Sequence, residues 1–135
     1  MTQNFFIDLA EDNIMNVVRF FRGDNHTLNF YIQNDGDIFD LSGYTAKFSV
    51  KKELTDTAYS FYADNIVPGS GVITVEIEPA DTEGLDAGEY YYDLEISGTK
   101  TITVVSDILE VKSDVTTSVV VNYIVTENSQ KLIFE

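Results

Sequence analysis

Cysteine is absent from this 135-residue chain, which excludes two common ways of holding a small fold together. Without thiols the chain can form neither disulfides nor thiolate metal sites, so it is not a small disulfide-stapled secreted module. Tryptophan is absent too, and proline occurs only twice. Nine phenylalanines and eight tyrosines supply the aromatic surface, and 44% of the residues are hydrophobic, which suits a single domain with a β-rich core.

Basic residues are few. Eight Lys and Arg side chains stand against 23 Asp and Glu, which gives a net charge of −15. Such an excess of negative charge argues against nucleic acid or an anionic membrane as a partner. No Lys or Arg occurs from Glu53 to Thr99. The simplest interpretation of this acidic region is a solvated face, and the alternative is a docking surface for a basic partner.

Long hydrophobic runs are also missing. No stretch approaches the roughly 20 apolar residues that a membrane-spanning helix needs. The first twelve residues have neither the basic region nor the long apolar run of a signal peptide. We therefore expect a protein made in the cytoplasm, with no membrane partner.

Residues with catalytic potential are sparse. The single histidine, His26, lies next to a turn, and a triad or zinc site would have to use it. Asp35, Asp37 and Asp40 lack the regular spacing of a calcium loop, and a hairpin turn explains them better. Only a carboxylate pair for glycoside hydrolysis stays open, because its separation is a spatial property. We expect no enzyme activity, cofactor or metal.

Strict alternation of apolar and polar residues predicts a series of half-buried strands separated by turns rich in Gly, Asn and Asp. About seven strands with a turn every 8 to 12 residues are typical of an immunoglobulin-like antiparallel β-sandwich. One helical turn is expected at 79–84, where proline begins and glycine ends the segment. The expected strands cover residues 16–21, 27–33, 38–41, 44–51, 58–62, 72–78, 89–96 and 100–111.

A turn followed by a tyrosine-rich strand is the most specific local pattern. Asp86 and Gly88 are turn residues, and Tyr90 stands at the start of a strand with alternate residues facing the core. In immunoglobulin-like sandwiches a tyrosine at this place sends its hydroxyl back to the preceding corner. We therefore predict that Asp86, Gly88 and Tyr90 form a fold-defining corner.

A recognisable pattern runs through about residues 17–111, in the segments 18–24, 28–30, 35–36, 39–52, 71–75, 79–82 and 87–95. It resembles that of one known family, the N-terminal domain of the baseplate upper protein of phages of Gram-positive bacteria. The resemblance implies a small β-sandwich that attaches receptor-binding tail parts to the virion. The implied function is that of a non-enzymatic virion structural protein, with other virion proteins as partners. A homo-oligomeric state is a separate expectation, because exchange of a C-terminal strand between copies would produce one.

The position within the virion stays open at this point. Family members continue into a long helical or fibrous region, whereas this chain ends at Glu135. That departure favours a compact connector in the baseplate or tail, in a collar or fibre base, or on the capsid.

Apolar segments flank the expected sandwich. We expect an N-terminal arm at 1–15, the sandwich at 16–112 and a C-terminal β extension at 113–135. Such arms should bury themselves on their own sandwich, on a neighbour's sheet edge or on another virion protein. The expected interface residues are Phe5, Phe6, Ile7, Leu9, Val119, Val121, Tyr123, Val125, Leu132 and Phe134.

An alternative function is a carbohydrate-binding or host-adhesion module. Tyr59, Tyr62 and Tyr91 are expected on the outside of the sandwich, where tyrosine rings can stack on a sugar. The competing interpretation is that they pack across strands.

Overall fold

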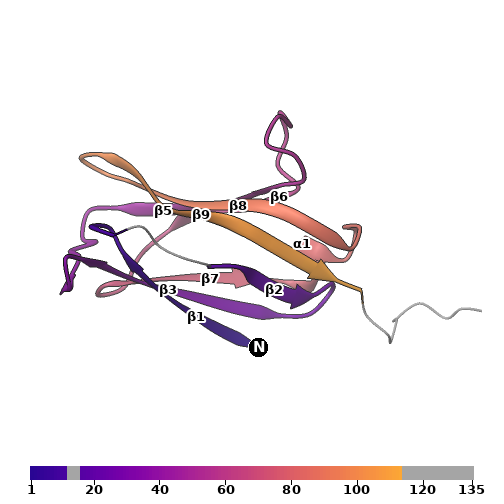
Figure 1. Cartoon of the computed structure of the whole chain (residues 1–135), viewed down its shortest axis with the longest axis horizontal. Coiled ribbons are helices and arrows are strands. Elements are labelled where there is room, and N and C mark those ends of the chain that lie inside the picture. The colour runs from indigo at the N-terminus through magenta and orange to yellow at the C-terminus, as the bar shows by residue number, and fades with distance from the viewer. Residues whose placement is uncertain (12–15, 114–135) are drawn as a thin grey trace, which may run out of the picture.

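The computed structural model of the chain describes residues 1–11 and 16–113, and it folds them into two β-sheets that lie face to face (Figure 1). The described residues form nine strands and one helical turn, so the all-β prediction is confirmed. The elements are β1 (Thr2–Asp8), β2 (Val18–Phe21), β3 (His26–Asn34), β4 (Asp37–Ile38), β5 (Thr45–Lys51), β6 (Phe61–Ile66), β7 (Val72–Ile77), α1 (Pro79–Thr82), β8 (Gly88–Ser97) and β9 (Thr101–Lys112).

Both sheets are mixed, which corrects the expectation of a purely antiparallel sandwich. The five-stranded sheet has the order β2-β9-β8-β5-β6, and β2 runs parallel to β9. In the four-stranded sheet β3 pairs with β1 in parallel and with β4 and β7 antiparallel. The parallel pair β1–β3 follows from the chain path. After β1 the chain crosses to the other sheet to form β2 and then returns to form β3, so it reverses direction twice and β1 and β3 run in the same direction.

The N-terminal segment is therefore part of the sandwich and not an arm beside it. Residues Thr2 to Asp8 pair one by one with Thr27 to Gln33. Phe5 and Ile7 point into the core, and the Phe5 ring stacks on Phe30 with a centroid distance of 4.9 Å. The expected boundary between an arm at 1–15 and a sandwich at 16–112 is thus wrong for these residues.

The core lies between the two sheets and is rich in aromatic rings. Phe30 of β3 lies 6.3 Å from Phe48 of β5 and 6.3 Å from Tyr92 of β8, measured between ring centroids. These contacts join the two sheets directly, because β3 belongs to one and β5 and β8 to the other. Other fully buried side chains include Ile7, Val18, Phe20, Leu28, Ile32, Ile73, Leu94, Ile96 and Leu109.

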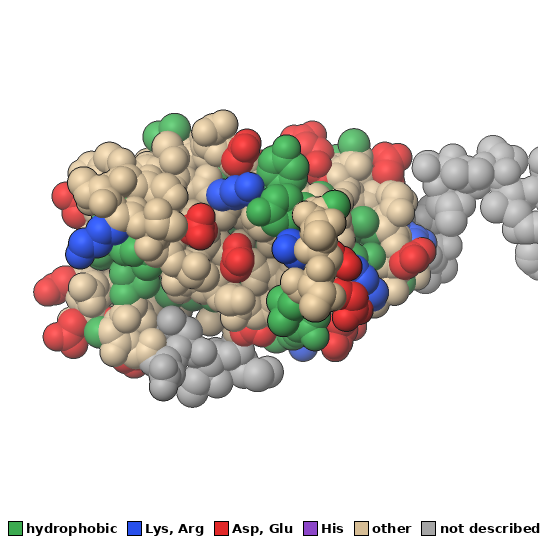
Figure 2. Space-filling view, turned by 90° about the horizontal axis from the view of Figure 1, so that it is seen from above, with side chains coloured by type: hydrophobic (Ala, Val, Ile, Leu, Met, Phe, Trp, Pro, Cys, Tyr) green, Lys and Arg blue, Asp and Glu red, His purple; other side chains and the backbone are tan. Residues whose placement is uncertain are grey.

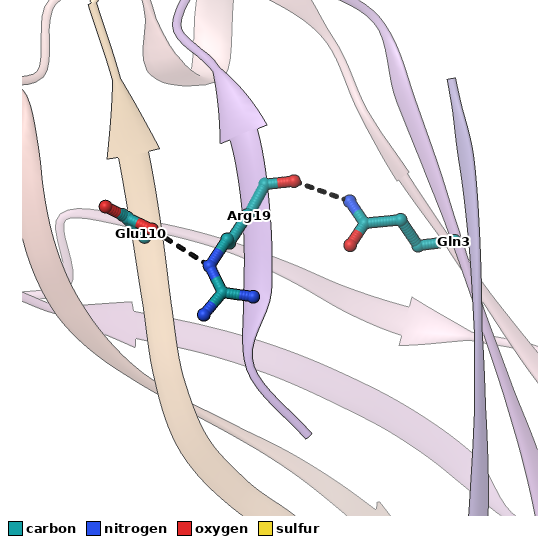
Figure 3. Close-up of polar contacts among 3 residues, drawn as sticks. All are labelled: Gln3, Arg19 and Glu110. Carbon is teal, nitrogen blue, oxygen red and sulfur yellow. Dashed lines mark hydrogen bonds and ion pairs between the residues drawn. The ribbon is translucent and has the colours of Figure 1, made fainter. Parts of the chain in front are cut away.

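One side of the sandwich is closed by side-chain contacts between the two edge strands β1 and β2 (Figure 3). Gln3 Nε2 donates a hydrogen bond to the backbone carbonyl oxygen of Arg19 at 2.7 Å. Arg19 Nε in turn donates to Glu110 Oε1 at 3.0 Å. The Gln3 amide occupies a backbone acceptor that an edge strand would otherwise offer to another strand.

Turns and the short helix tie the ends of the sheets together. The hydroxyl of Thr82 in α1 accepts a hydrogen bond from the Gly23 backbone at 2.8 Å, and Arg22 Nη1 donates to the Leu85 carbonyl at 2.9 Å. His26 is buried, stacks on Phe20 and places Nε2 3.0 Å from the Phe21 carbonyl oxygen. The single histidine thus packs as a core residue beside this turn.

Candidate interaction surfaces

The predicted corner residues lie together at the start of β8. Tyr90 is buried, and its hydroxyl donates a hydrogen bond to the carbonyl oxygen of Asp86 at 2.8 Å. Gly88 has a φ of +141°, which side chains rarely adopt, and a Cβ there would meet Lys52 Nζ at 3.1 Å. Burial, followed by the charge of Asp86, raises the pKa of the Tyr90 phenol above its usual value. The phenol therefore stays a hydrogen-bond donor.

A second tyrosine hydroxyl forms a hydrogen bond to the chain segment that passes from one sheet to the other, between β1 and β2. Tyr92 donates a hydrogen bond to the Asn16 carbonyl oxygen at 2.6 Å, and both residues are buried. The Asn16 backbone N–H donates to Asp107 Oδ2 at 2.8 Å. Burial, with a smaller effect of the Asp107 charge, raises the pKa of Tyr92. Nothing in the local pattern around Tyr92 indicated this partner.

A hollow of about 320 Å³ lies on the outer face of the five-stranded sheet. Its floor comes from β5, β8 and β9, and its wall comes from the connection between β5 and β6, which rises above the sheet (Figure 1). Figure 2 shows lysine, carboxylate and hydrophobic side chains intermixed on this face. The lining residues are Lys47, Ser49, Lys51, Leu54, Tyr59, Tyr91, Tyr92, Asp93, Glu95 and Ser106.

The three tyrosines considered for sugar stacking have different surroundings. Tyr59 and Tyr91 line the hollow, whereas Tyr62 does not and packs beside Tyr59 at 5.4 Å between ring centroids. The ammonium group of Lys47 lies over both Tyr59 and Tyr62, at 4.6 and 5.2 Å from the ring centroids. These cation–π contacts fasten the β5–β6 connection to the sheet. Within the described residues, no ring or cation packs against Tyr91 in this way.

The outer face of the four-stranded sheet has a different character. A row of polar side chains crosses it, in which Thr74 Oγ1 donates to Asn29 Oδ1 at 2.8 Å and Asn29 Nδ2 donates to Asn4 Oδ1 at 3.1 Å. Beside this row, Phe6 stacks on Tyr31 at 5.2 Å and is 72% exposed. Aromatic side chains are enriched in protein interfaces, so this exposed pair is a candidate contact surface.

The expected interface residues thus separate into three groups. Phe5 and Ile7 are core residues, which corrects their expected interface role, because their side chains have no free surface to offer. Phe6 is exposed, and Leu9 is half-buried against the core. Val119, Val121, Tyr123, Val125, Leu132 and Phe134 lie outside the described residues.

Residues 1–11 and 16–113 contain neither a metal-binding cluster nor a membrane-spanning helix. No group of three or more His, Cys, Asp or Glu side chains there is placed to hold a metal ion. No helix there has the length and apolar character needed to cross a membrane.

The family model of the BppU N-terminal domain matches residues 1–134. The chain belongs to this family. The match extends beyond residues 17–111, which carry the sequence resemblance, and it includes the N-terminal strand. BppU is the phage baseplate upper protein, so the family expected from the sequence is confirmed.

A solved phage structure has the same fold. The N-terminal domain of phage TP901-1 ORF48 is 15% identical, with a TM-score of 0.53, and the similarity covers 83% of this chain and 99% of that one. A multicopper oxidase (11% identity, TM-score 0.40, 82% of this chain and 44% of that one) is less similar. The cysteine protease inhibitor EhICP2 of Entamoeba histolytica (14% identity, TM-score 0.34, 84% and 97%) is less similar still. No curated protein matches the chain.

Proposed function

We propose that this protein is a non-enzymatic structural part of a phage virion, located in the baseplate, and that it acts through contacts with other virion proteins. The observation that carries the proposal is the family match over residues 1–134. The fold shared with the N-terminal domain of phage TP901-1 ORF48 supports the proposal, because the similarity extends over 99% of that phage domain. A rigid sandwich with an aromatic core is suited to hold partners in fixed positions.

The contacts are expected to include strand addition. The sequence at 113–135 contains a β-branched apolar stretch, Val119 to Val125 with Asn122 and Tyr123, which suits pairing with an open sheet edge. Among the described residues, β1, β2, β6 and β7 each have a strand partner on one side only, but the Gln3 side chain already links β1 to β2. The edges of β6 and β7 are therefore the better candidates. The β5–β6 pairing contains a register shift and β6 a positive φ at Asn65, whereas β3–β7 is regular over six residue pairs. Since irregular edges resist pairing, β7 is the better acceptor.

Deleting residues 113–135 tests this mode of assembly. If the segment joins one copy to another, the full-length chain is a homo-oligomer and the truncated chain is a monomer by light scattering at equal concentration. A matched variant with residues 126–135 removed keeps the β-branched stretch and should keep the full-length mass. A truncated chain with an unchanged oligomeric state would refute strand addition by this segment.

We further infer that the sandwich is immunoglobulin-like. The order β9-β8-β5-β6 corresponds to strands G, F, C and C′, and the antiparallel pair β3–β7 corresponds to B and E. The hydrogen bond from Tyr90 at the start of β8 has the form of a tyrosine corner. The parallel pairing of β1 with β3 departs from this pattern.

A further inference from the structure

The hollow on the five-stranded sheet contains a row of polar side chains that have no partner. Asp93 of β8 lies in register with Ser49 of β5 on one side and with Ser106 of β9 on the other. All three line the hollow; Ser49 is buried, Asp93 is half-buried and Ser106 is exposed. Within the described part of the chain, no hydrogen bond or ion pair engages these three side chains. Their polar atoms are therefore open to solvent and available to a ligand.

The half-buried carboxylate carries a cost that a ligand could relieve. Burial, followed by the negative charge of Glu95, raises the pKa of Asp93 above its usual value. The positive charges of Lys51 and Lys47 act in the opposite direction. The ammonium groups of both lysines lie over the ring of Tyr59, and neither is within ion-pair distance of Asp93. Hydroxyl groups of a ligand would give Asp93 the hydrogen-bond donors that it lacks.

Tyr91 offers an open aromatic face next to this row. It is two residues before Asp93 on the same face of β8, which separates the two side chains by about 7 Å along the strand. Tyr91 is 38% exposed and Tyr59 is 42% exposed, but the ammonium groups of Lys47 and Lys51 lie over the Tyr59 ring. Tyr91 is therefore the ring that is free to stack on a ligand.

The charges of the lining favour a neutral ligand. The two positive charges of Lys47 and Lys51 cancel the two negative charges of Asp93 and Glu95 in the lining. A cationic ligand would be repelled by the lysines, and an anionic ligand by the carboxylates. The net charge of −15 disfavours an anion further. The volume of about 320 Å³ is at the lower end of the range for small-molecule sites, roughly 300 to 1,000 Å³, which suits one or two sugar rings.

We propose that this hollow binds a neutral saccharide, with Tyr91 stacked under the sugar ring and Asp93, Ser49 and Ser106 hydrogen-bonded to its hydroxyls. Tyr59 is a positioning residue that holds the wall of the hollow in place through Lys47 and Lys51. Tyr62 lies outside the hollow and supports Tyr59. The proposal is independent of the position of the protein in the virion.

The test is a titration of the full-length protein, followed by ¹H–¹⁵N NMR, with glucose, galactose, rhamnose, N-acetylglucosamine and their disaccharides. Saturable shifts at β5, β8 and β9 amides are expected for at least one neutral sugar. Tyr91→Ala should abolish these shifts, and Tyr91→Phe should keep the affinity within about threefold because the ring remains. Asp93→Asn should weaken binding by about tenfold or more, since hydrogen bonds to a charged group are lost.

Phe6→Ala is the matched control, because it removes an exposed aromatic ring from the opposite sheet. It should leave the affinity unchanged, and unchanged spectra outside the hollow show that each variant is folded. The proposal is overturned if no neutral sugar shifts the hollow, or if Phe6→Ala weakens binding as much as Tyr91→Ala. It is also overturned if only a lysine-rich peptide or glucuronic acid, used as charged probes, binds there.

Discussion

Truncating the two neighbouring phenylalanines of β1 should have very different effects on stability. Phe5 is 9% exposed and stacks on Phe30 in the core, whereas Phe6 is 72% exposed and touches Tyr31 on the outer face. Removing a buried phenylalanine ring typically costs about 3 to 5 kcal/mol, and an edge strand can partly relax around the gap. We therefore expect Phe5→Ala to lower the free energy of unfolding by about 3 kcal/mol.

Phe6→Ala removes only an exposed aromatic pair, so its cost should stay below about 1.5 kcal/mol. Urea unfolding followed by tyrosine fluorescence measures both, at one protein concentration because any oligomer would make stability concentration-dependent. If Phe5→Ala does not fold, Phe5→Leu serves instead and should cost less while still exceeding Phe6→Ala. Equal losses for the two positions would refute the account of β1 as a core strand.

Three further predictions concern the polar contacts. Tyr92→Phe should lower the free energy of unfolding by about 2 kcal/mol, because it leaves the buried Asn16 carbonyl oxygen without its donor. Tyr90→Phe should lower it by only about 1 kcal/mol, because Asp86 is exposed and water can replace the lost hydroxyl. Urea unfolding that gives the reverse order would contradict this. Stability should fall as the pH rises above about 10, since the unfolded state releases the Tyr92 proton more readily than the folded state does, and this slope should be smaller in Tyr92→Phe; an equal slope would exclude Tyr92 as its source. Backbone hydrogen bonds, first from Ala10 and then from Asp35 and Gly36, lower the pKa of the Asp8 carboxyl group below its usual value of 3.8. The stability that this carboxylate contributes is therefore fully present above pH 3.8 and is lost as the pH falls through the lower pKa of the folded state. Amide exchange at Asp35 and Gly36, corrected for its intrinsic pH dependence, should accelerate over that range, and a flat profile would argue against this role.

Local patterns predicted the elements whose partners are close in sequence or whose faces alternate. The more buried residues alternate along β3, β7 and β8, and they do so only in part along β5 and β9, where residues 48–50 and 104–105 are buried in succession. The predicted bounds of these five strands differ from the observed ones by only one or two residues. The hydrogen bond from Tyr90 to Asp86 joins residues four apart, so turn chemistry alone can indicate it. β6 begins three residues later than predicted, after the wall of the hollow.

Features that depend on register between distant strands could not be predicted in this way. The continuous apolar run of Phe5, Phe6 and Ile7 predicts an arm, because nothing in it indicates a parallel partner that lies 25 residues away. The row of Ser49, Asp93 and Ser106 exists only because β5, β8 and β9 align at those positions. No spacing along the chain contains that information, so the composition of the hollow required the structure.

Immunoelectron microscopy of purified phage particles tests the central claim most directly. Particles of the source phage would be labelled with an antibody against this chain, with an antibody preparation absorbed on the purified protein as the control. The account predicts label at the baseplate end of the tail. Particles without label, together with the absence of peptides of this chain from their mass spectrum, would contradict it.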